Sequence, residues 1–182
     1  IMVERGYKNV VTIAWKYAFG EESVNAFTEG LTKAGGKVSK ELWAPFPTVE
    51  FQALLTQIAS LKPDAVYAFF AGAGALKFVK DYAAAGLKGK IPLFGSGFLT
   101  DGVLEAQGEA ADGLETTLHY GDGIDTPRNN AFRLAYVKAF KSQPDVYAVQ
   151  GYDAGLLYAD GLDAVKGNTA NKPALIAAME KV

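Results

Sequence analysis

Hydrophobic and polar positions alternate in a repeated order over roughly the first half of the chain. Short apolar runs typical of buried strands lie at 9–15, 64–70 and 91–95, and the more polar segment 37–46 also reads as a strand. The segments between them repeat apolar residues at helical spacing, at 21–36, 49–61 and 74–86. Three successive strand–helix units predict an α/β fold in three layers, a parallel sheet with right-handed crossovers and helices on both faces.

Local signals mark the ends of these helices. Gly35 and Gly36 stop the first helix, and Gly86 stops the third. Pro63 follows the second helix, for which Thr48 is the expected N-cap. The boundaries therefore agree with the periodic pattern.

The pattern changes after residue 98. We expect a short helix with a loop, then a strand, then three helices, at 98–113, 113–120, 126–143, 146–167 and 172–182. Thr126 is the expected N-cap of the first of these three helices, and Pro127 lies in its first turn. No strand separates the last two helices, so the sequence offers them no sheet partner.

The carboxyl ends of the predicted strands mark the expected ligand site, because ligands of open parallel sheets bind outside those ends. This rule selects the segments 15–20, 71–74 and 95–98. The first segment carries three aromatic residues at alternate positions, Trp15, Tyr17 and Phe19. We expect Trp15 to lie within the strand, whereas core packing and ligand contact both remain open for Tyr17 and Phe19.

Composition excludes several classes of function. Lys and Arg total 18 against 20 Asp and Glu, without a basic cluster, so nucleic acid is not an expected partner. The chain has no Cys and a single histidine, His119, which excludes thiol chemistry and a metal site with two histidines. Packing or hydrogen bonding of His119 at a strand exit accounts for it more simply than catalysis does.

Short motifs favour neither a cofactor nor a metal. The loop after the first strand lacks the G-x-G-x-x-G pattern, and GLKGKI at 86–91 lacks the hydroxyl residue of a phosphate loop. Glycines flank Ser96 directly, unlike the serine of a nucleophile elbow. The acidic stretch 119–125 lacks the ligand spacing of a calcium loop and fits a turn. We expect a protein without catalytic residues.

A succession of motifs covers nearly the whole chain. In order they are YxxG at 17–20, LKPDAVYAFFAG at 61–72, FVKDYAAAGLKGKIPLFGSG at 78–97, GLETTLHY at 113–120, NxxF at 129–132 and VQGYDAG at 149–155. This order resembles the type I periplasmic solute-binding proteins of the branched-chain amino acid ABC transporter class. The resemblance implies two α/β lobes, about twice this length in total, that close on a small ligand and deliver it to a permease.

The resemblance also divides the chain. It implies that 5–120 form the second lobe, a type I periplasmic-binding-protein lobe, and that 121–144 form a helix and a hinge-proximal segment. Residues 145–182 correspond to helices that return to a mostly missing first lobe. We therefore expect a fragment, in keeping with its start at Ile1, and exposed apolar faces through which two copies could dimerise.

The ligand contacts that the resemblance implies are Tyr17, Phe19, Ala71, Gly72, Ala73, Ser96, Gly97, Phe98 and Tyr147. Members that bind α-amino acids usually carry an acidic residue where this chain has Gly97. A buried ammonium without a counter-charge costs several kcal/mol, which disfavours an ordinary α-amino acid. The small residues at 71–74 are expected to leave room for a flat ring, so an aromatic carboxylate fits better.

We expect the periplasmic solute-binding component of an ABC importer, which captures an aromatic carboxylate or amino-acid-like ligand between two lobes. Two alternatives remain open on the sequence alone. One is the ligand-sensing domain of a receptor or transcription regulator with the same fold. The other is an enzyme, such as a nucleotide-using α/β protein, whose turnover would depend on His119.

Overall fold

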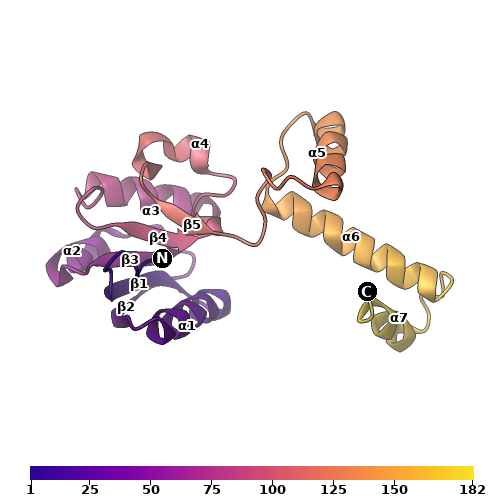
Figure 1. Cartoon of the computed structure of the whole chain (residues 1–182), viewed down its shortest axis with the longest axis horizontal. Helices are drawn as coiled ribbons and strands as arrows, with labels where there is room; N and C mark the ends of the chain where they lie inside the picture. Colours follow the sequence, from indigo (N-terminus) through magenta and orange to yellow (C-terminus); the bar gives the residue numbers. More distant parts are fainter. The chain divides into compact units, whose positions relative to one another are not determined.

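The computed structural model describes residues 1–182, which form two compact units, Ile1–His119 and Tyr120–Val182. The first unit contains the strands β1 Asn9–Lys16, β2 Lys37–Pro45, β3 Ala65–Phe69, β4 Leu93–Ser96 and β5 Glu115–Thr117. Its helices are α1 Ala18–Lys33, α2 Gln52–Leu61, α3 Gly72–Ala84 and α4 Leu104–Gln107, with the 3₁₀ turns η1 Gly97–Leu99 and η2 Gly108–Ala111. The second unit contains helices only (Figure 1).

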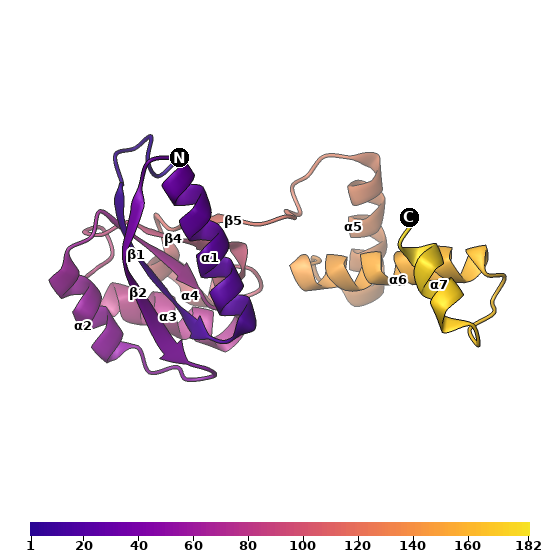
Figure 2. The same cartoon turned by 90° about the horizontal axis from the view of Figure 1, so that it is seen from below.

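The five strands form one parallel sheet in the order β2-β1-β3-β4-β5. One face packs its alternate residues, such as Ile13 and Ala68, against α2 and α3. The other face packs Ala14 and Phe69 against Val24 of α1. Helix α1 lies on the opposite side of the sheet from α2 and α3 (Figures 1 and 2). Strands that are covered on both faces read as continuous apolar runs, as the inner strands β1 and β3 do here. The predicted three-layer α/β fold is confirmed.

The second helix begins later than predicted. Thr48 accepts a hydrogen bond from the Glu50 N–H at 3.2 Å, but α2 begins at Gln52 and its N-cap residue is Phe51. Phe51 is 1% exposed. Burying a phenylalanine contributes about 1.5–3 kcal/mol, against about 1 kcal/mol for a typical hydroxyl cap. The prediction that Thr48 caps this helix was wrong, because core packing decides where the helix begins.

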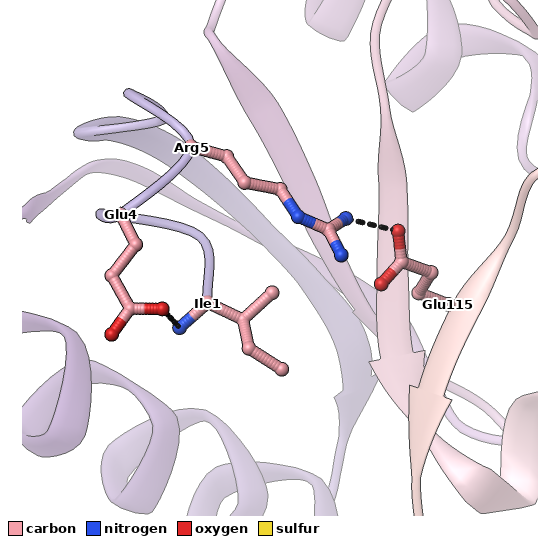
Figure 3. A network of polar contacts seen from close by, with 4 residues as sticks. All are labelled: Ile1, Glu4, Arg5 and Glu115. Atoms are coloured by element: carbon pink, nitrogen blue, oxygen red, sulfur yellow. Dashed lines mark hydrogen bonds and ion pairs between the residues drawn. The ribbon is translucent and has the colours of Figure 1, made fainter.

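An ion pair joins the segment before β1 to the edge strand β5. The Arg5 guanidinium donates a hydrogen bond to the Glu115 carboxylate, and this bond raises the pKa of Arg5 above its usual value. Beside it, the amino group of Ile1 lies 3.3 Å from the Glu4 carboxylate (Figure 3). These side chains are exposed, so water and salt screen both pairs. Both ion pairs lie at the surface, outside the hydrophobic core of the sheet.

Tyr82 of α3 makes the stability of the fold sensitive to alkaline pH. Its ring is buried, its hydroxyl donates to the Ile91 carbonyl at 2.9 Å, and burial raises the pKa of Tyr82 above 10. Below the unfolded pKa of about 10 both states are protonated. As the pH rises further, only the unfolded phenol ionises, so folding is disfavoured.

We therefore expect the free energy of unfolding to fall above pH 10, and Tyr82→Phe to reduce this fall. At pH 8 the free energy of unfolding of the variant is lower by about 1 kcal/mol, because the Ile91 carbonyl no longer accepts a hydrogen bond from the Tyr82 hydroxyl. Urea denaturation at pH 8 and at pH 10.5 measures both effects. Tyr158→Phe, at an exposed position of the second unit, serves as the control. An identical alkaline loss in Tyr82→Phe and in the unchanged protein would contradict the prediction.

The second unit consists of α5 Pro127–Phe140, α6 Val146–Ala164 and α7 Lys172–Met179. Thr126 accepts a hydrogen bond from the Asn129 N–H at 3.2 Å and Pro127 opens α5, which confirms the predicted start. The buried Asn129 accepts from the Tyr120 hydroxyl and donates to the carbonyls of Asp122 and Ile124. Asn129 thus holds the stretch before α5 as a turn.

Neither unit contains a helix that is long and apolar enough to cross a membrane.

Candidate functional site

The carboxyl ends of β1, β3 and β4 lie side by side and bring three of the predicted ligand segments to one edge of the sheet. The register pairs Ala14 of β1 with Phe69 of β3, and Ala68 of β3 with Gly95 of β4. The predicted residues of the first unit follow these positions directly: Tyr17, Phe19, Ala71, Gly72, Ala73, Ser96, Gly97 and Phe98. The ninth, Tyr147, is exposed on the first turn of α6 in the second unit.

Phe19 is an exposed aromatic ring supported by buried ones. It is 47% exposed, and its ring centroid lies 4.8 Å from Phe69 and 5.6 Å from Phe98. Phe69 is fully buried at the end of β3, and Phe98 is half-buried within η1. The sequence predicts only a strand at Phe69, but as the last residue of β3 it places its ring against Phe19. The rings of Phe19 and Phe98 form an apolar surface at the edge, and Phe69 packs beneath it.

Trp15 belongs to the core and supports the site from below. It is 7% exposed, and its indole N–H donates to the Thr48 carbonyl at 2.8 Å. The rings of Phe46 and Phe70 meet it edge-on at 5.3 Å. Trp15 therefore packs within the protein, as expected for a residue of the strand, and fixes the loop that follows β2.

Tyr17 stacks on Phe46, a residue outside the predicted site. The rings of Tyr17 and Phe46 lie 4.8 Å apart at an angle of 25°, and Phe46 is 55% exposed. Partial burial raises the pKa of Tyr17. The available signal was an apolar residue between two prolines directly after the second strand. The predicted site includes only the segments that follow β1, β3 and β4.

The segment 71–74 leaves less room than predicted. Gly72 has a φ of 53° and open space around its α-carbon, and Ala73 is exposed. At Gly74, however, an added Cβ would lie 2.1 Å from Cζ2 of Trp15. The prediction that all four positions leave space for a ligand ring was wrong for Gly74, because the indole of Trp15 already fills that space.

The space beside Gly97 is filled by Leu118. A Cβ at this position would lie 2.4 Å from the Cβ of Leu118, which follows β5. The Gly97 carbonyl accepts hydrogen bonds from the N–H groups of Thr100 and Asp101 at 3.0 and 2.8 Å, so its backbone is held in place. Beside it, the Ser96 hydroxyl oxygen is buried without a hydrogen-bond partner. Leu118 therefore occupies the space that a side chain at 97 would need.

Electrostatically, the edge favours a negative charge. The helices α1 and α3 both begin here, and their N-cap residues, Tyr17 and Ala71, make no side-chain cap hydrogen bond. The first N–H groups of a helix carry a partial positive charge and bind anions. Glu21, in the first turn of α1, is paired with Lys16 at 2.8 Å. The edge thus combines apolar rings with two helix N-termini.

A hollow of about 270 Å³ lies at the opposite, amino end of the sheet. Arg5 and Lys88 line it, but Arg5 is bonded to Glu115, and Lys88 lies 3.6 Å from the Asp112 carboxylate. A ligand would have to displace existing partners there. The carboxyl edge is the better candidate site.

Comparison with known proteins gives consistent matches. The whole chain, residues 1–182, matches a family model described as a periplasmic binding protein. The Leu/Ile/Val-binding protein homolog 6 of Brucella melitensis is 36% identical over 135 residues, which cover 72% of this chain and 35% of that protein.

Two solved structures extend the comparison. The solute-binding protein of an ABC transporter from R. palustris, in complex with benzoate, is 54% identical with a TM-score of 0.91. The match covers 98% of this chain and 49% of that one. A solute-binding protein from Rhodopseudomonas palustris BisB5, in complex with 3,4-dihydroxybenzoic acid, is 32% identical with a TM-score of 0.86, covering 97% and 49% of the two chains. This chain thus spans about half the length of both structures.

Proposed function

Since this chain belongs to the periplasmic binding protein family, we propose that it forms one wall of a two-lobe protein that captures an aromatic carboxylate for an ABC importer in the periplasm. In this proposal residues 5–120 are the second lobe, 121–144 a helix and a hinge-proximal segment, and 145–182 helices that return to the first lobe. The protein binds its ligand without covalent chemistry and presents it to the permease.

The observation that carries the proposal is the exposed ring of Phe19, packed against the buried Phe69 and the half-buried Phe98. Aromatic pairs contribute about 0.5–1.5 kcal/mol beyond the burial of their area, so a ligand ring gains most from a surface already made of rings. The open positions Gly72 and Ala73 leave space beside this surface. The family resemblance adds Ser96, Gly97 and, from α6, Tyr147 as further proposed contacts.

The charge of the site supports an acid rather than an amino acid. The N-termini of α1 and α3 favour a carboxylate, and Leu118 fills the space where a counter-charge for an ammonium group would stand at Gly97. An α-amino acid would bring its ammonium into this edge unpaired, at a cost of several kcal/mol. An aromatic carboxylate avoids that cost.

The relatives support the same ligand class. The protein that is 54% identical was solved with benzoate, and the one that is 32% identical with 3,4-dihydroxybenzoic acid. Both ligands consist of one flat ring and one carboxylate. This chemistry fits the apolar rings and helix N-termini of the carboxyl edge.

Transport follows from closure of the two lobes on the ligand. A ligand closes the protein only by binding the closed form more tightly than the open form. The aromatic edge of this chain supplies one part of the extra affinity for the closed form, and the other lobe supplies the rest. One lobe alone is therefore expected to bind weakly, and the permease engages the closed, loaded protein.

The proposal is tested by titrating the full-length two-lobe protein with benzoate in a calorimeter. We expect Phe19→Ala to raise the dissociation constant about tenfold, because one aromatic pair contributes up to about 1.5 kcal/mol. Leu61→Ala is the matched control: Leu61 is 42% exposed, like Phe19, but ends α2. Binding of α-amino acids in place of benzoate would contradict the proposal, as would a dissociation constant that Phe19→Ala leaves unchanged.

A further inference from the structure

Phe46 is an exposed aromatic residue at the carboxyl edge of the sheet. It follows β2 at the carboxyl edge, and at 55% exposure it presents more of its surface to solvent than Phe19 does. Single exposed apolar residues are common and need no explanation. Phe46 is different because it joins a larger aromatic surface through its stack on Tyr17.

The loop that carries Phe46 is held rigidly. Prolines flank the ring at 45 and 47, and the Thr48 N–H donates to the Pro45 carbonyl at 2.8 Å. The Thr48 carbonyl accepts the indole N–H of Trp15, also at 2.8 Å. The ring of Trp15 then meets Phe46 edge-on. A ring that is already ordered loses little conformational entropy when it binds a ligand.

Phe46 extends the aromatic surface by one strand. The row runs Phe46, Tyr17, Phe19, Phe69, Phe98, with successive ring centroids 4.8, 6.5, 4.8 and 6.1 Å apart. It follows the strand order β2-β1-β3-β4. Phe46 and Tyr17 directly follow β2 and β1, Phe19 lies in the first turn of α1, Phe69 ends β3, and Phe98 lies in η1 after β4. Favourable ring pairs need centroids within about 4.5–7 Å. A single ligand ring therefore reaches only its nearest neighbours and leaves part of the row unused.

We propose that Phe46 is a further ligand-contacting residue that lets the site accept aromatic carboxylates with a second ring. This inference rests on the proposed function and adds to it a preference within the aromatic acids. Every aromatic carboxylate ligand places one ring beside Phe19. In a ligand with two rings, the second ring lies against the Tyr17–Phe46 pair. Phe46 then discriminates between ligands by their size and contributes little to the binding of benzoate.

The test compares benzoate with 2-naphthoate by calorimetry on the full-length two-lobe protein. We expect 2-naphthoate to bind more tightly than benzoate, and Phe46→Ala to weaken 2-naphthoate roughly tenfold while changing benzoate less than threefold. Phe46→Tyr keeps the ring and should retain the preference. If Phe46 merely supported Tyr17, Phe46→Ala would weaken both ligands equally, which would overturn the inference.

The remaining outcomes separate the two proposals. A protein that binds benzoate but not 2-naphthoate, or whose 2-naphthoate affinity is unchanged in Phe46→Ala, refutes the role of Phe46 and leaves the proposed function standing. A protein that binds neither acid refutes both. Because the ring of Phe46 is exposed, the variants should fold, and an unchanged melting temperature before titration verifies this.

Discussion

Replacing Gly74 by alanine is expected to lower the free energy of unfolding by about 3 kcal/mol, although alanine is the better helix former. The added Cβ would lie 2.1 and 2.3 Å from Cζ2 and Cη2 of Trp15. The indole cannot move away, because its N–H bonds to Thr48 and its ring is enclosed by Phe46 and Phe70. Overpacking of this kind costs about 1–3 kcal/mol. Urea denaturation measures the loss.

Gly30→Ala is the matched control for this prediction. Gly30 also lies within a helix, α1, but no atom stands within 4 Å of its added Cβ. The same substitution should stabilise the protein there by about 0.5–1 kcal/mol, because a helical glycine loses more backbone entropy than alanine. Opposite signs at the two positions are the expected result. A gain in stability at Gly74 would show that the close contact with Trp15 does not exist.

Gly97→Asp is expected to destabilise the protein by about 2 kcal/mol and to weaken benzoate binding. The new side chain meets the Cβ of Leu118 at 2.4 Å, and a Cβ cannot turn away by changing rotamer. The backbone of Gly97 cannot move away from Leu118 easily, because the Gly97 carbonyl accepts hydrogen bonds from the N–H groups of Thr100 and Asp101. Any carboxylate that does enter the edge repels the ligand carboxylate. Denaturation and calorimetry measure the two effects separately.

A second substitution tests the cause of this loss. Leu118→Gly removes the obstructing Cβ, so the double variant should recover part of the stability that Gly97→Asp loses, a coupling typical of residues in contact. Gly121→Asp, which has no atom within 4 Å of its added Cβ, controls for the effect of a new charge. Equal losses in Gly97→Asp and Gly121→Asp would contradict the steric explanation.

The elements of the fold could be predicted because their causes are local. The apolar run at 64–70 and the helical spacing at 74–86 report which residues are buried, and β3 and α3 formed where these patterns lie. Thr126 and Pro127 likewise begin α5 through contacts within a single turn. Once strands and helices alternate in this way, a parallel sheet is the architecture that covers both faces of every strand.

The site could be predicted only in part. The rule on carboxyl ends brought Tyr17, Phe19 and Phe98 to one edge, since the ends of parallel strands are neighbours wherever their order in the sheet allows. The predicted site did not include Phe46, because the sequence places this residue at the end of the second strand but not beside Tyr17. That contact depends on β2 being the neighbour of β1.

The sequence by itself therefore determined the strands, the helices, the α/β class and the edge at which aromatic residues gather. The tertiary structure alone decided which spaces at that edge are filled: Trp15 fills the space beside Gly74, and Leu118 fills the space beside Gly97. It also decided that α2 begins after Phe51 and not after Thr48. The first two contacts join residues from different strands and helices. Periodicity records that a residue is buried, but only the packed sheet decides against which partner, because that choice follows from strand order and side-chain shape.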